Sequence, residues 1–302
     1  MKVDLSEGEA RPSTLYVVAT PIGNMGDITL RAIKVLGSVD VIAAEDTRVT
    51  KGLLAKLKLQ GRLISYREHN EVTSSNGIIK LLSSGNSVAI VTDAGTPAIC
   101  DPGAVLVSRA REAGYHVEPV PGASALTAAI SVSGLSQAGF LFKGFLPAKA
   151  SERKFVLTNF ENSDVPVVVF ESPHRIKECL FDMISIFGHD LKIFIGRELT
   201  KVHEETVLFT LHEAVNWVSS GVYQSRGEFV IVLFFSASSR EDEKVPQEAI
   251  ELLRELMVSL SLKQAVDIVA KYAQVRRKKV YQIALEMKEE LDINKIGDHK
   301  HE

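Results

Sequence analysis

Three loops of the 302-residue sequence combine glycine and proline with acidic or hydroxyl residues, as ligand-binding loops do. They are Thr20–Asp27 (TPIGNMGD), Asp93–Gly103 (DAGTPAICDPG) and Pro121–Ala125 (PGASA). Glycine lets the backbone approach a ligand closely, and the free amide groups at helix starts attract its anionic parts. Each loop alone is equally well explained as a turn or a helix cap. Three of them after three predicted strands favour a single binding site.

Two adjacent carboxylates, Glu45 and Asp46, stand at the end of another predicted strand. A carboxylate at a ligand-binding edge can act as the general base that removes a proton from a hydroxyl nucleophile. An N-cap of the next helix, paired with Arg48, is an equally good interpretation of Asp46. The other titratable candidates that we consider are His69, Glu171, Glu198 and Lys201.

Several ligand classes are disfavoured by spacing. A dinucleotide fold requires G-x-G-x-x-G after its first strand, and the first loop supplies only Gly23 and Gly26. There is no Walker A lysine pattern, which disfavours hydrolysis of nucleoside triphosphates. The eight histidines show no metal-ligand spacing, so no metal site is predicted.

The loops require a scaffold of parallel strands joined by helices, and the first half of the chain has that pattern. Its expected strands are Leu15–Ala19, Asp40–Ala44, Arg62–Ser65, Ser87–Thr92 and His116–Pro119. Its expected helices are Ile28–Gly37, Val49–Leu57, Asn70–Ser83, Pro102–Ala113 and Ala123–Ser133. Asp101 is suited to N-cap the fourth helix, since Pro102 follows it and Gly114 ends the helix.

The pattern changes after residue 139, where strand candidates alternate less regularly with helices and predict a mixed αβ domain. The strand candidates are Phe140–Leu146, Val165–Phe170, Leu191–Ile195, Glu205–Leu211 and Glu228–Phe235. The helix candidates are Arg153–Phe160, Pro173–Phe187 and His212–Ser219. Ser172 is expected to cap the helix at Pro173, which leaves Arg175 free to bind an RNA phosphate or to pair with Glu171.

A charged linker, Ser236–Lys244, precedes three short helical patterns: Pro246–Leu256, Leu262–Tyr272 and Arg277–Glu289. In the last of them Val280, Ile283, Ala284 and Met287 share one apolar face. The cations Arg276–Lys279 stand at its start, where they oppose the helix dipole but attract a phosphate. Leu262–Tyr272, followed by a short turn and this last helix, resembles a helix-turn-helix. A charged, solvent-exposed surface on a small interaction domain is the simpler interpretation of the same cations.

Composition sets broad limits on the function. The net charge is −3, so nucleic acid would have to bind at a local basic patch. The two cysteines are far apart and fit a reducing cytoplasm rather than a disulfide framework. No apolar run reaches membrane-spanning length, and the polar N-terminus does not read as a signal peptide, so we expect a soluble protein that binds no membrane.

Seven motifs, in order along the chain, resemble those of the bacterial ribosomal RNA small-subunit methyltransferase I family. Besides TPIGNMGD, DAGTPAICDPG and PGASA they are AEDTR from Ala44, GFLP from Gly144, ESPHR from Glu171 and RELTK from Arg197. The resemblance implies an α/β fold of the tetrapyrrole-methylase type: αβ domains at residues 14–120 and 121–236, and a small helical RNA-binding domain at 246–290. The first loop also differs from the G-x-G-x-G-D of porphyrin-precursor methylases.

The resemblance further implies S-adenosylmethionine as the cofactor, held between the two αβ domains. The implied reaction is 2′-O-methylation of a decoding-centre cytidine, cytidine 1402 in standard 16S numbering, by a cytoplasmic homodimer acting on small-subunit rRNA or the assembling 30S subunit. The expected cofactor-binding residues are Pro21, Gly23, Asp93, Ala94, Gly95, Thr96, Pro97, Ser124, Ala125, Phe145, Leu146 and Pro147.

Asp46 and Glu45 are the first candidates for the catalytic base, and the sequence does not choose between them. The expected RNA-binding residues are Arg48, Arg175, Arg276, Arg277, Lys278 and Lys279. Two other functions stay open. A methylase of the same fold that acts on a tetrapyrrole or on diphthine would have no use for the basic C-terminal helices. A non-enzymatic nucleic-acid-binding module would have no use for the clustered loops.

Overall fold

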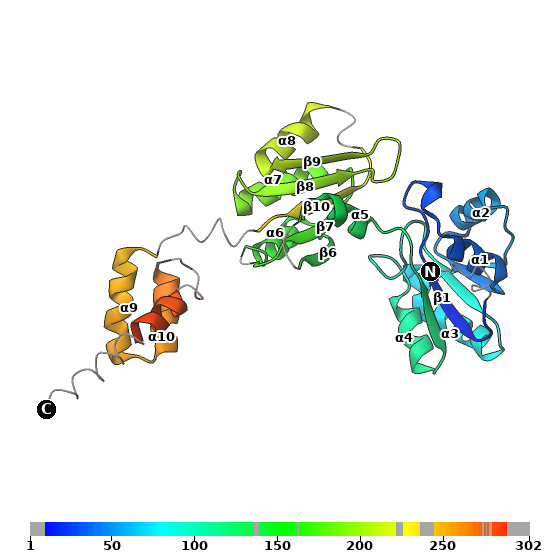
Figure 1. Ribbon diagram of the computed structural model, residues 1–302, viewed down its shortest axis with the longest axis horizontal. Helices are drawn as coiled ribbons and strands as arrows, with labels where there is room; N and C mark the ends of the chain where they lie inside the picture. The colour runs from blue at the N-terminus through cyan, green and yellow to red at the C-terminus, as the bar shows by residue number, and fades with distance from the viewer. Residues whose placement is uncertain are drawn as a thin grey trace, which may run out of the picture. The chain divides into compact units, whose positions relative to one another are not determined.

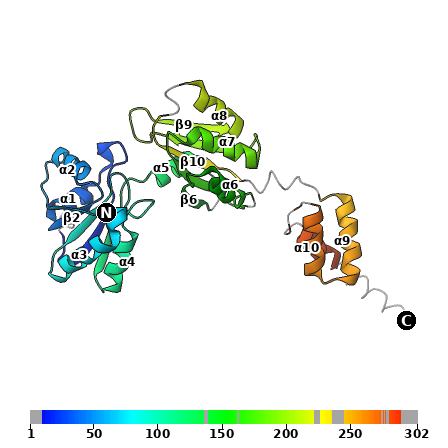
Figure 2. The same cartoon turned by 180° about the vertical axis from the view of Figure 1, so that it is seen from behind.

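The computed structural model describes residues 10–135, 139–161, 163–221, 226–235, 245–273, 275, 277 and 280–288. Residues 1–235 form one compact unit, which contains two β-sheets, and residues 236–302 form a second unit (Figures 1 and 2). Among the residues described, no helix combines the length and apolar character needed to cross a membrane.

The first sheet is fully parallel, with strand order β3-β2-β4-β1-β5. Its strands are β1 (Thr14–Val18), β2 (Val41–Ala44), β3 (Leu63–Ser65), β4 (Val88–Val91) and β5 (His116–Val120). The helices between them are α1 (Leu30–Ser38), α2 (Thr47–Lys56), α3 (Glu71–Ser83) and α4 (Ala104–Glu112), with short 3-10 turns at Met25–Asp27 and Glu68–Asn70. The order confirms the predicted wound parallel sheet.

Successive residues of each strand point to opposite faces of this sheet, and both faces are covered. Tyr16 and Val18 pack with residues of α1 and α2 on one face. Leu15 packs with Ile78 of α3 and Leu106 of α4 on the other. Figure 1 shows α1 and α2 on one side of β1, with α3 and α4 on the other. The result is a three-layer domain whose loops gather at the carboxyl edge of the sheet.

The second sheet is mixed, with strand order β6-β7-β10-β8-β9; only β6 and β7 are parallel. Its strands are β6 (Leu141–Phe145), β7 (Val167–Glu171), β8 (Lys192–Arg197), β9 (Glu205–Thr210) and β10 (Phe229–Leu233). Its helices are α5 (Ala125–Val132), α6 (Ala150–Thr158), α7 (Ile176–Phe187) and α8 (Leu211–Ser220). Helices α6, α7 and α8 cover one face, and Ala129 of α5 packs on the other together with Ile22 of the first loop.

Two predicted helix caps, Asp101 and Ser172, are wrong. Helix α4 begins at Ala104, after Gly103 with a φ of +139°, and Asp101 does not cap it. The amide of Gly103 instead donates to Glu71 Oε1 of α3 at 2.8 Å. Helix α7 begins at Ile176 rather than Pro173, because the Ser172 carbonyl, and not its hydroxyl, accepts from the amides of Arg175 and Ile176.

The C-terminal unit contains α9 (Gln247–Ser259), α10 (Leu262–Tyr272) and a helical segment at residues 280–288. A capping box at Ser261 and Gln264 begins α10. Val280, Ala284 and Met287 are buried in the core of this unit and Ile283 packs against it, which confirms the predicted apolar face. The unit therefore has a hydrophobic core of its own.

Candidate active site

The three glycine-containing loops of the first domain are tied to one another. The amide of Thr20 donates to the Gly95 carbonyl at 2.8 Å, and the amide of Gly95 donates back at 3.1 Å. Thr20 Oγ1 also donates to the Thr92 carbonyl, and Thr96 Oγ1 donates to the Ala123 carbonyl, each at 3.1 Å. The loops that follow β1, β4 and β5 therefore lie side by side at the carboxyl edge of the sheet. Gly95 takes the positive φ of +84° that this arrangement requires.

At two glycines, one in each αβ domain, this edge of the first sheet contacts the second αβ domain. A Cβ added to Gly144, whose φ is +73°, would lie 2.5 Å from Cys100 Sγ. A Cβ added to Gly23 would overlap the Lys201 side chain. The GFLP and RELTK motifs of the second domain therefore border the loops of the first, as a cleft between the domains requires.

Two arginines hold the turn that contains Phe145, Leu146 and Pro147. Arg175 donates to the carbonyls of Leu146 at 2.6 Å and Pro147 at 3.0 Å. Arg153 donates to the carbonyls of Pro147 at 3.4 Å and Ala148 at 3.0 Å. The Leu146 side chain is buried in the second-domain core, so only its backbone faces the site. The Phe145 side chain is exposed and packs edge-on against Phe170.

The two arginines are themselves fixed by carboxylates. Arg153 is buried and pairs with Asp182 at 2.6 Å, and Arg175 pairs with the fully buried Glu171 at 3.3 Å. Arg175 is thus occupied by its own domain, and of the two roles predicted for it the structure shows the pairing with Glu171.

Asp46 is the N-cap of α2, where its carboxylate accepts from the amide of Arg48 at 2.8 Å and from the Arg48 guanidinium. The hydrogen bonds from Arg48 hold the pKa of Asp46 well below its ordinary value. A carboxylate with a depressed pKa is a weak base, so the capping interpretation is the better one. Glu45 is placed differently: its Oε2 accepts from the amide of Asp93 at 3.2 Å.

Among the carboxylates that the structure describes, Asp93 and Asp101 have raised pKa values. Burial raises the pKa of Asp93. Burial, followed by repulsion from Glu45, Asp93 and Glu228, raises the pKa of Asp101 to about 7. Raised pKa values of this kind cluster at functional sites. Sequence analysis assigned Asp101 to a helix cap, although its place in a strand-end loop with a second acid was a signal for a site residue.

The second domain contributes a cation, Lys201, that is held by two acids of that domain. Lys201 donates to Glu198 Oε1 at 2.7 Å and to Glu228 Oε2 at 3.0 Å. Glu198 and Thr200 take positive φ values of +51° and +68°, which are uncommon outside glycine and often accompany function. Thr200 Oγ1 is buried without a hydrogen-bond partner in the described residues.

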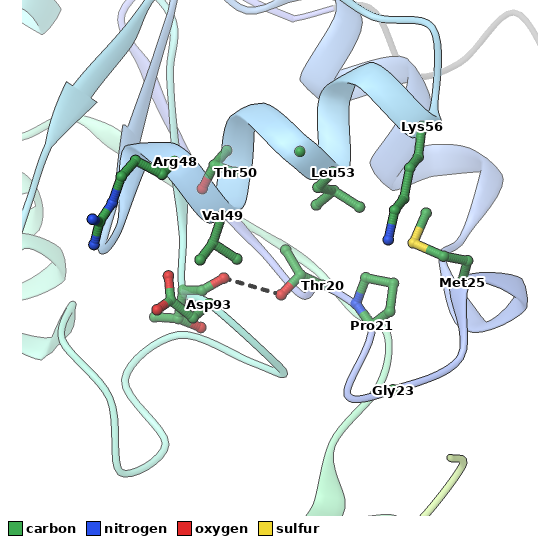
Figure 3. A pocket seen from close by; sticks show the side chains of 12 residues that line it. Thr20, Pro21, Gly23, Met25, Arg48, Val49, Thr50, Leu53, Lys56 and Asp93 are labelled. Carbon is green, nitrogen blue, oxygen red and sulfur yellow. Dashed lines mark hydrogen bonds between the residues drawn. The ribbon is translucent and has the colours of Figure 1, made fainter. Parts of the chain in front are cut away.

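A pocket of about 260 Å³ lies in the first domain between the first loop, α2 and the end of β4 (Figure 3). Its lining includes four residues predicted for the site: Pro21, Gly23, Arg48 and Asp93. In Figure 3 the side chains of Lys56 and Met25 lie beside Pro21, and Asp93 lies at the other end beyond Thr20. Within the described ranges no cluster of side chains could hold a metal ion.

The predicted RNA-binding cations are only partly described. The Arg48 side chain is 85% exposed although it pairs with Asp46. Arg277 is exposed and pairs with Asp267 of α10. Arg276, Lys278 and Lys279 lie outside the described residues.

Comparison with known proteins gives two matches to family models. Residues 14–215 match the model of Tetrapyrrole (Corrin/Porphyrin) Methylases, and residues 243–288 match that of the RsmI C-terminal HTH domain. The Ribosomal RNA small subunit methyltransferase I of Neisseria meningitidis serogroup B is 46% identical over 275 residues, covering 91% of this chain and 94% of that protein.

The chain belongs to the ribosomal RNA small subunit methyltransferase I family. The family member of Escherichia coli O157:H7 is 38% identical over 283 residues, covering 94% of this chain and 96% of that protein. Among solved structures, diphthine synthase superposes with a TM-score of 0.57 at 16% identity, covering 73% of this chain and 89% of that one. Cobalt precorrin-4 methyltransferase superposes with a TM-score of 0.53 at 19% identity, covering 73% of this chain and 94% of that one. These two likenesses show the fold of the αβ domains and carry no statement about the substrate.

Proposed function

We propose that this chain transfers the methyl group of S-adenosylmethionine to the 2′-oxygen of cytidine 1402 in the rRNA of the small ribosomal subunit. One observation carries this proposal: the methylase-type αβ pair and the C-terminal helical unit occur in one chain, and similarity to the family spans both. We place the enzyme in the cytoplasm, where ribosomal subunits are assembled.

The loops at the domain border fit the cofactor. The first domain supplies the backbone groups of Asp93–Pro97, and the second supplies those of Phe145–Pro147. Hydrogen bonds within each domain fix these turns, so the backbone groups that make no such bond can bind a ligand. Ser124, at the N-cap of α5, makes no capping hydrogen bond with its side chain. The cofactor supplies an electrophilic methyl group on a sulfonium, and the protein must align the ribose oxygen with it.

The 2′-hydroxyl is a better nucleophile when a base accepts its proton. Among the predicted pair, Glu45 fits this role better than Asp46, whose carboxylate is committed to Arg48 and the α2 cap. Asp101 stands in the same acidic group and is the second candidate. We propose that proton acceptance belongs to Glu45 or Asp101, with Asp46 positioning α2.

A tetrapyrrole or diphthine methylase of the same fold is the nearest alternative. It is supported only by fold similarity, since the solved methylases are 14–21% identical to this chain. It leaves the C-terminal unit without a role. A non-enzymatic nucleic-acid-binding module leaves the joined strand-end loops without one.

Methylation of small subunits from cells that lack this methyltransferase tests the proposal. The subunits are incubated with the protein and labelled S-adenosylmethionine, and the rRNA is digested for nucleoside mass spectrometry. We expect one 2′-O-methylcytidine, at position 1402. A base-methylated product, or no transfer to RNA, contradicts the proposal. Sedimentation of the same protein measures the homodimer that we also propose.

A further inference from the structure

The pocket beneath α2 has the form of a small binding site with distinct ends. Val49, Leu53, Pro21 and Met25 give it apolar walls, while Lys56 lies at one end and Asp93 at the other (Figure 3). Its volume of about 260 Å³ is slightly below the range of roughly 300–1,000 Å³ for pockets that take drug-sized ligands. It has room for one planar base rather than for a whole cofactor.

Gly52, in the middle of α2, keeps this pocket open. Val49, Gly52, Leu53 and Lys56 follow the spacing that places residues on one helix face. Glycine weakens a helix interior, and here no neighbour demands it, because a Cβ added to Gly52 meets no heavy atom within 4 Å. The local consequence of the glycine is therefore space within the pocket.

The helix that covers the pocket is basic. Residues 47–58 contain Arg48, Lys51, Lys56 and Lys58 and no acid, although the net charge of the chain is −3. All four side chains belong to exposed residues. Arg48 pairs with Asp46, whereas the three lysines form no ion pair with any residue that the structure describes. Of the three lysines only Lys56 lines the pocket. An exposed cation that pairs with no described residue, beside an apolar pocket, fits a nucleotide whose phosphate lies next to a flat ring.

We propose that this pocket receives one base of the RNA substrate and that Lys56 binds a phosphate that flanks it, with Lys51 and Lys58 adding positive charge in the same segment of the chain. The inference rests on the proposed function and assigns a nucleotide subsite within it. An enzyme that acts on a nucleotide within folded RNA gains access by taking that nucleotide out of its stack into a pocket. At the end opposite Lys56 the exposed carboxylate of Asp93, whose backbone we assign to the cofactor loop, can accept from an exocyclic amino group such as N4 of cytosine.

Filling the pocket tests the inference with a matched control. Gly52→Leu places a side chain in the open space, whereas Gly77→Leu places the same side chain on α3, outside the pocket, where an added Cβ also meets nothing within 4 Å. Both changes favour their helices, so we expect both proteins to fold. We expect Gly52→Leu to raise the KM for unmethylated small subunits by about ten-fold or more, because the leucine takes the space of the base. S-adenosylmethionine should bind both variants with the affinity of the unmodified protein in calorimetry.

Lys56 is tested by the salt dependence of binding to the same subunits. Replacing one phosphate-binding lysine lowers the slope of log K against log salt concentration by about 1. We expect this for Lys56→Gln, and an unchanged slope for Lys80→Gln on α3.

The outcomes separate this inference from the proposed function. If the unmodified protein methylates cytidine 1402 while Gly52→Leu behaves as Gly77→Leu does, the subsite is overturned and the function stands. If Gly52→Leu weakens S-adenosylmethionine binding as much as subunit binding, the pocket belongs to the cofactor and the inference is overturned. If the unmodified protein transfers no methyl group to RNA, the proposed function itself fails.

Discussion

The two aspartates of the site differ in what their surroundings do to the charge. Asp46 is stabilised as a carboxylate by the guanidinium and the backbone amide of Arg48. Asp101 is half-buried among Glu45, Asp93 and Glu228, which disfavour its ionised form. The same side chain is therefore a structural cap at one position and a group that titrates near neutral pH at the other.

Substitution of Asp46 tests whether this residue acts as the N-cap of α2 or as the catalytic base. Asparagine is as good an N-cap as aspartate, and alanine is a poor one. We expect Asp46→Asn to keep most of the methylation rate and Asp46→Ala to lower Tm by a few degrees. A methylation assay and thermal unfolding measure the two effects. A large fall in kcat for Asp46→Asn, in a protein of unchanged Tm, would identify Asp46 as the base after all.

The raised pKa of Asp101 makes stability depend on pH. The pKa of Asp101 is about 7 in the folded protein, which holds the proton up to that pH, whereas the unfolded chain releases it near the ordinary aspartate pKa of 3.8. The folded state therefore binds more protons between these values, and stability falls as pH rises through that window. Asp101→Asn removes the effect, so we expect it to stabilise the protein at pH 8 by about 1 kcal/mol, a figure reduced for solvent screening, and to change it little at pH 4. Denaturant unfolding of both proteins at pH 4 and pH 8 measures the change in the free energy of unfolding. An equal change at the two pH values would contradict the burial of the Asp101 charge.

At the scale of elements, the turn after β6 depends on arginines that are distant in sequence. Arg153 on α6 and Arg175 just before α7 donate to the carbonyls of Leu146–Ala148, and each is paired with a buried carboxylate. The conformation of this turn is thus fixed by hydrogen bonds from two charged side chains that need not contact a ligand.

Removing one partner of such a buried pair leaves the other uncompensated. We expect Arg153→Met to lower the free energy of unfolding by about 3–5 kcal/mol, since Asp182 then keeps only the half-exposed Lys154 as a cation. The double variant Arg153→Met/Asp182→Leu should recover a large part of this loss, because both charges are absent. Chemical denaturation measures both proteins. A double variant as unstable as the single one would show that Arg153 acts by packing rather than by charge.

Sequence patterns predicted the elements better than their ends. Short apolar runs separated by helix-length segments predicted the parallel sheet, and the loops after these strands lie together, as the contacts of Thr20 with Gly95 and of Thr96 with Ala123 show. The starts of α4 and α7 were missed because their amides are satisfied by Glu71 and by a backbone carbonyl, which local capping rules do not include. The high pKa of Asp101 depends on burial and on Glu228, 127 residues away in sequence, so the site acids could not be ranked from spacing alone.

At the scale of the whole molecule, the chain divides its work between two units with separate hydrophobic cores. Residues 1–235 contain the loops that fit a cofactor, and the unit at residues 236–302 matches a helix-turn-helix model. Although the net charge is −3, residues 47–58 and residues 276–279 each contain four cations and no acid, which gives each unit a basic segment.

The division predicts that RNA binding and cofactor binding can be lost separately. Deleting residues 236–302 leaves the described cores of the αβ unit intact, so we expect cofactor affinity in calorimetry to stay within about two-fold, a difference well below 1 kcal/mol. Binding to unmethylated small subunits should weaken by ten-fold or more, about 1.4 kcal/mol, and its salt dependence should fall because phosphate contacts are lost. The shortened protein should still respond to Lys56→Gln, since the cations of α2 remain. An equal loss of both affinities, in a protein that still unfolds cooperatively, would mean that the C-terminal unit completes the cofactor site instead of holding the RNA.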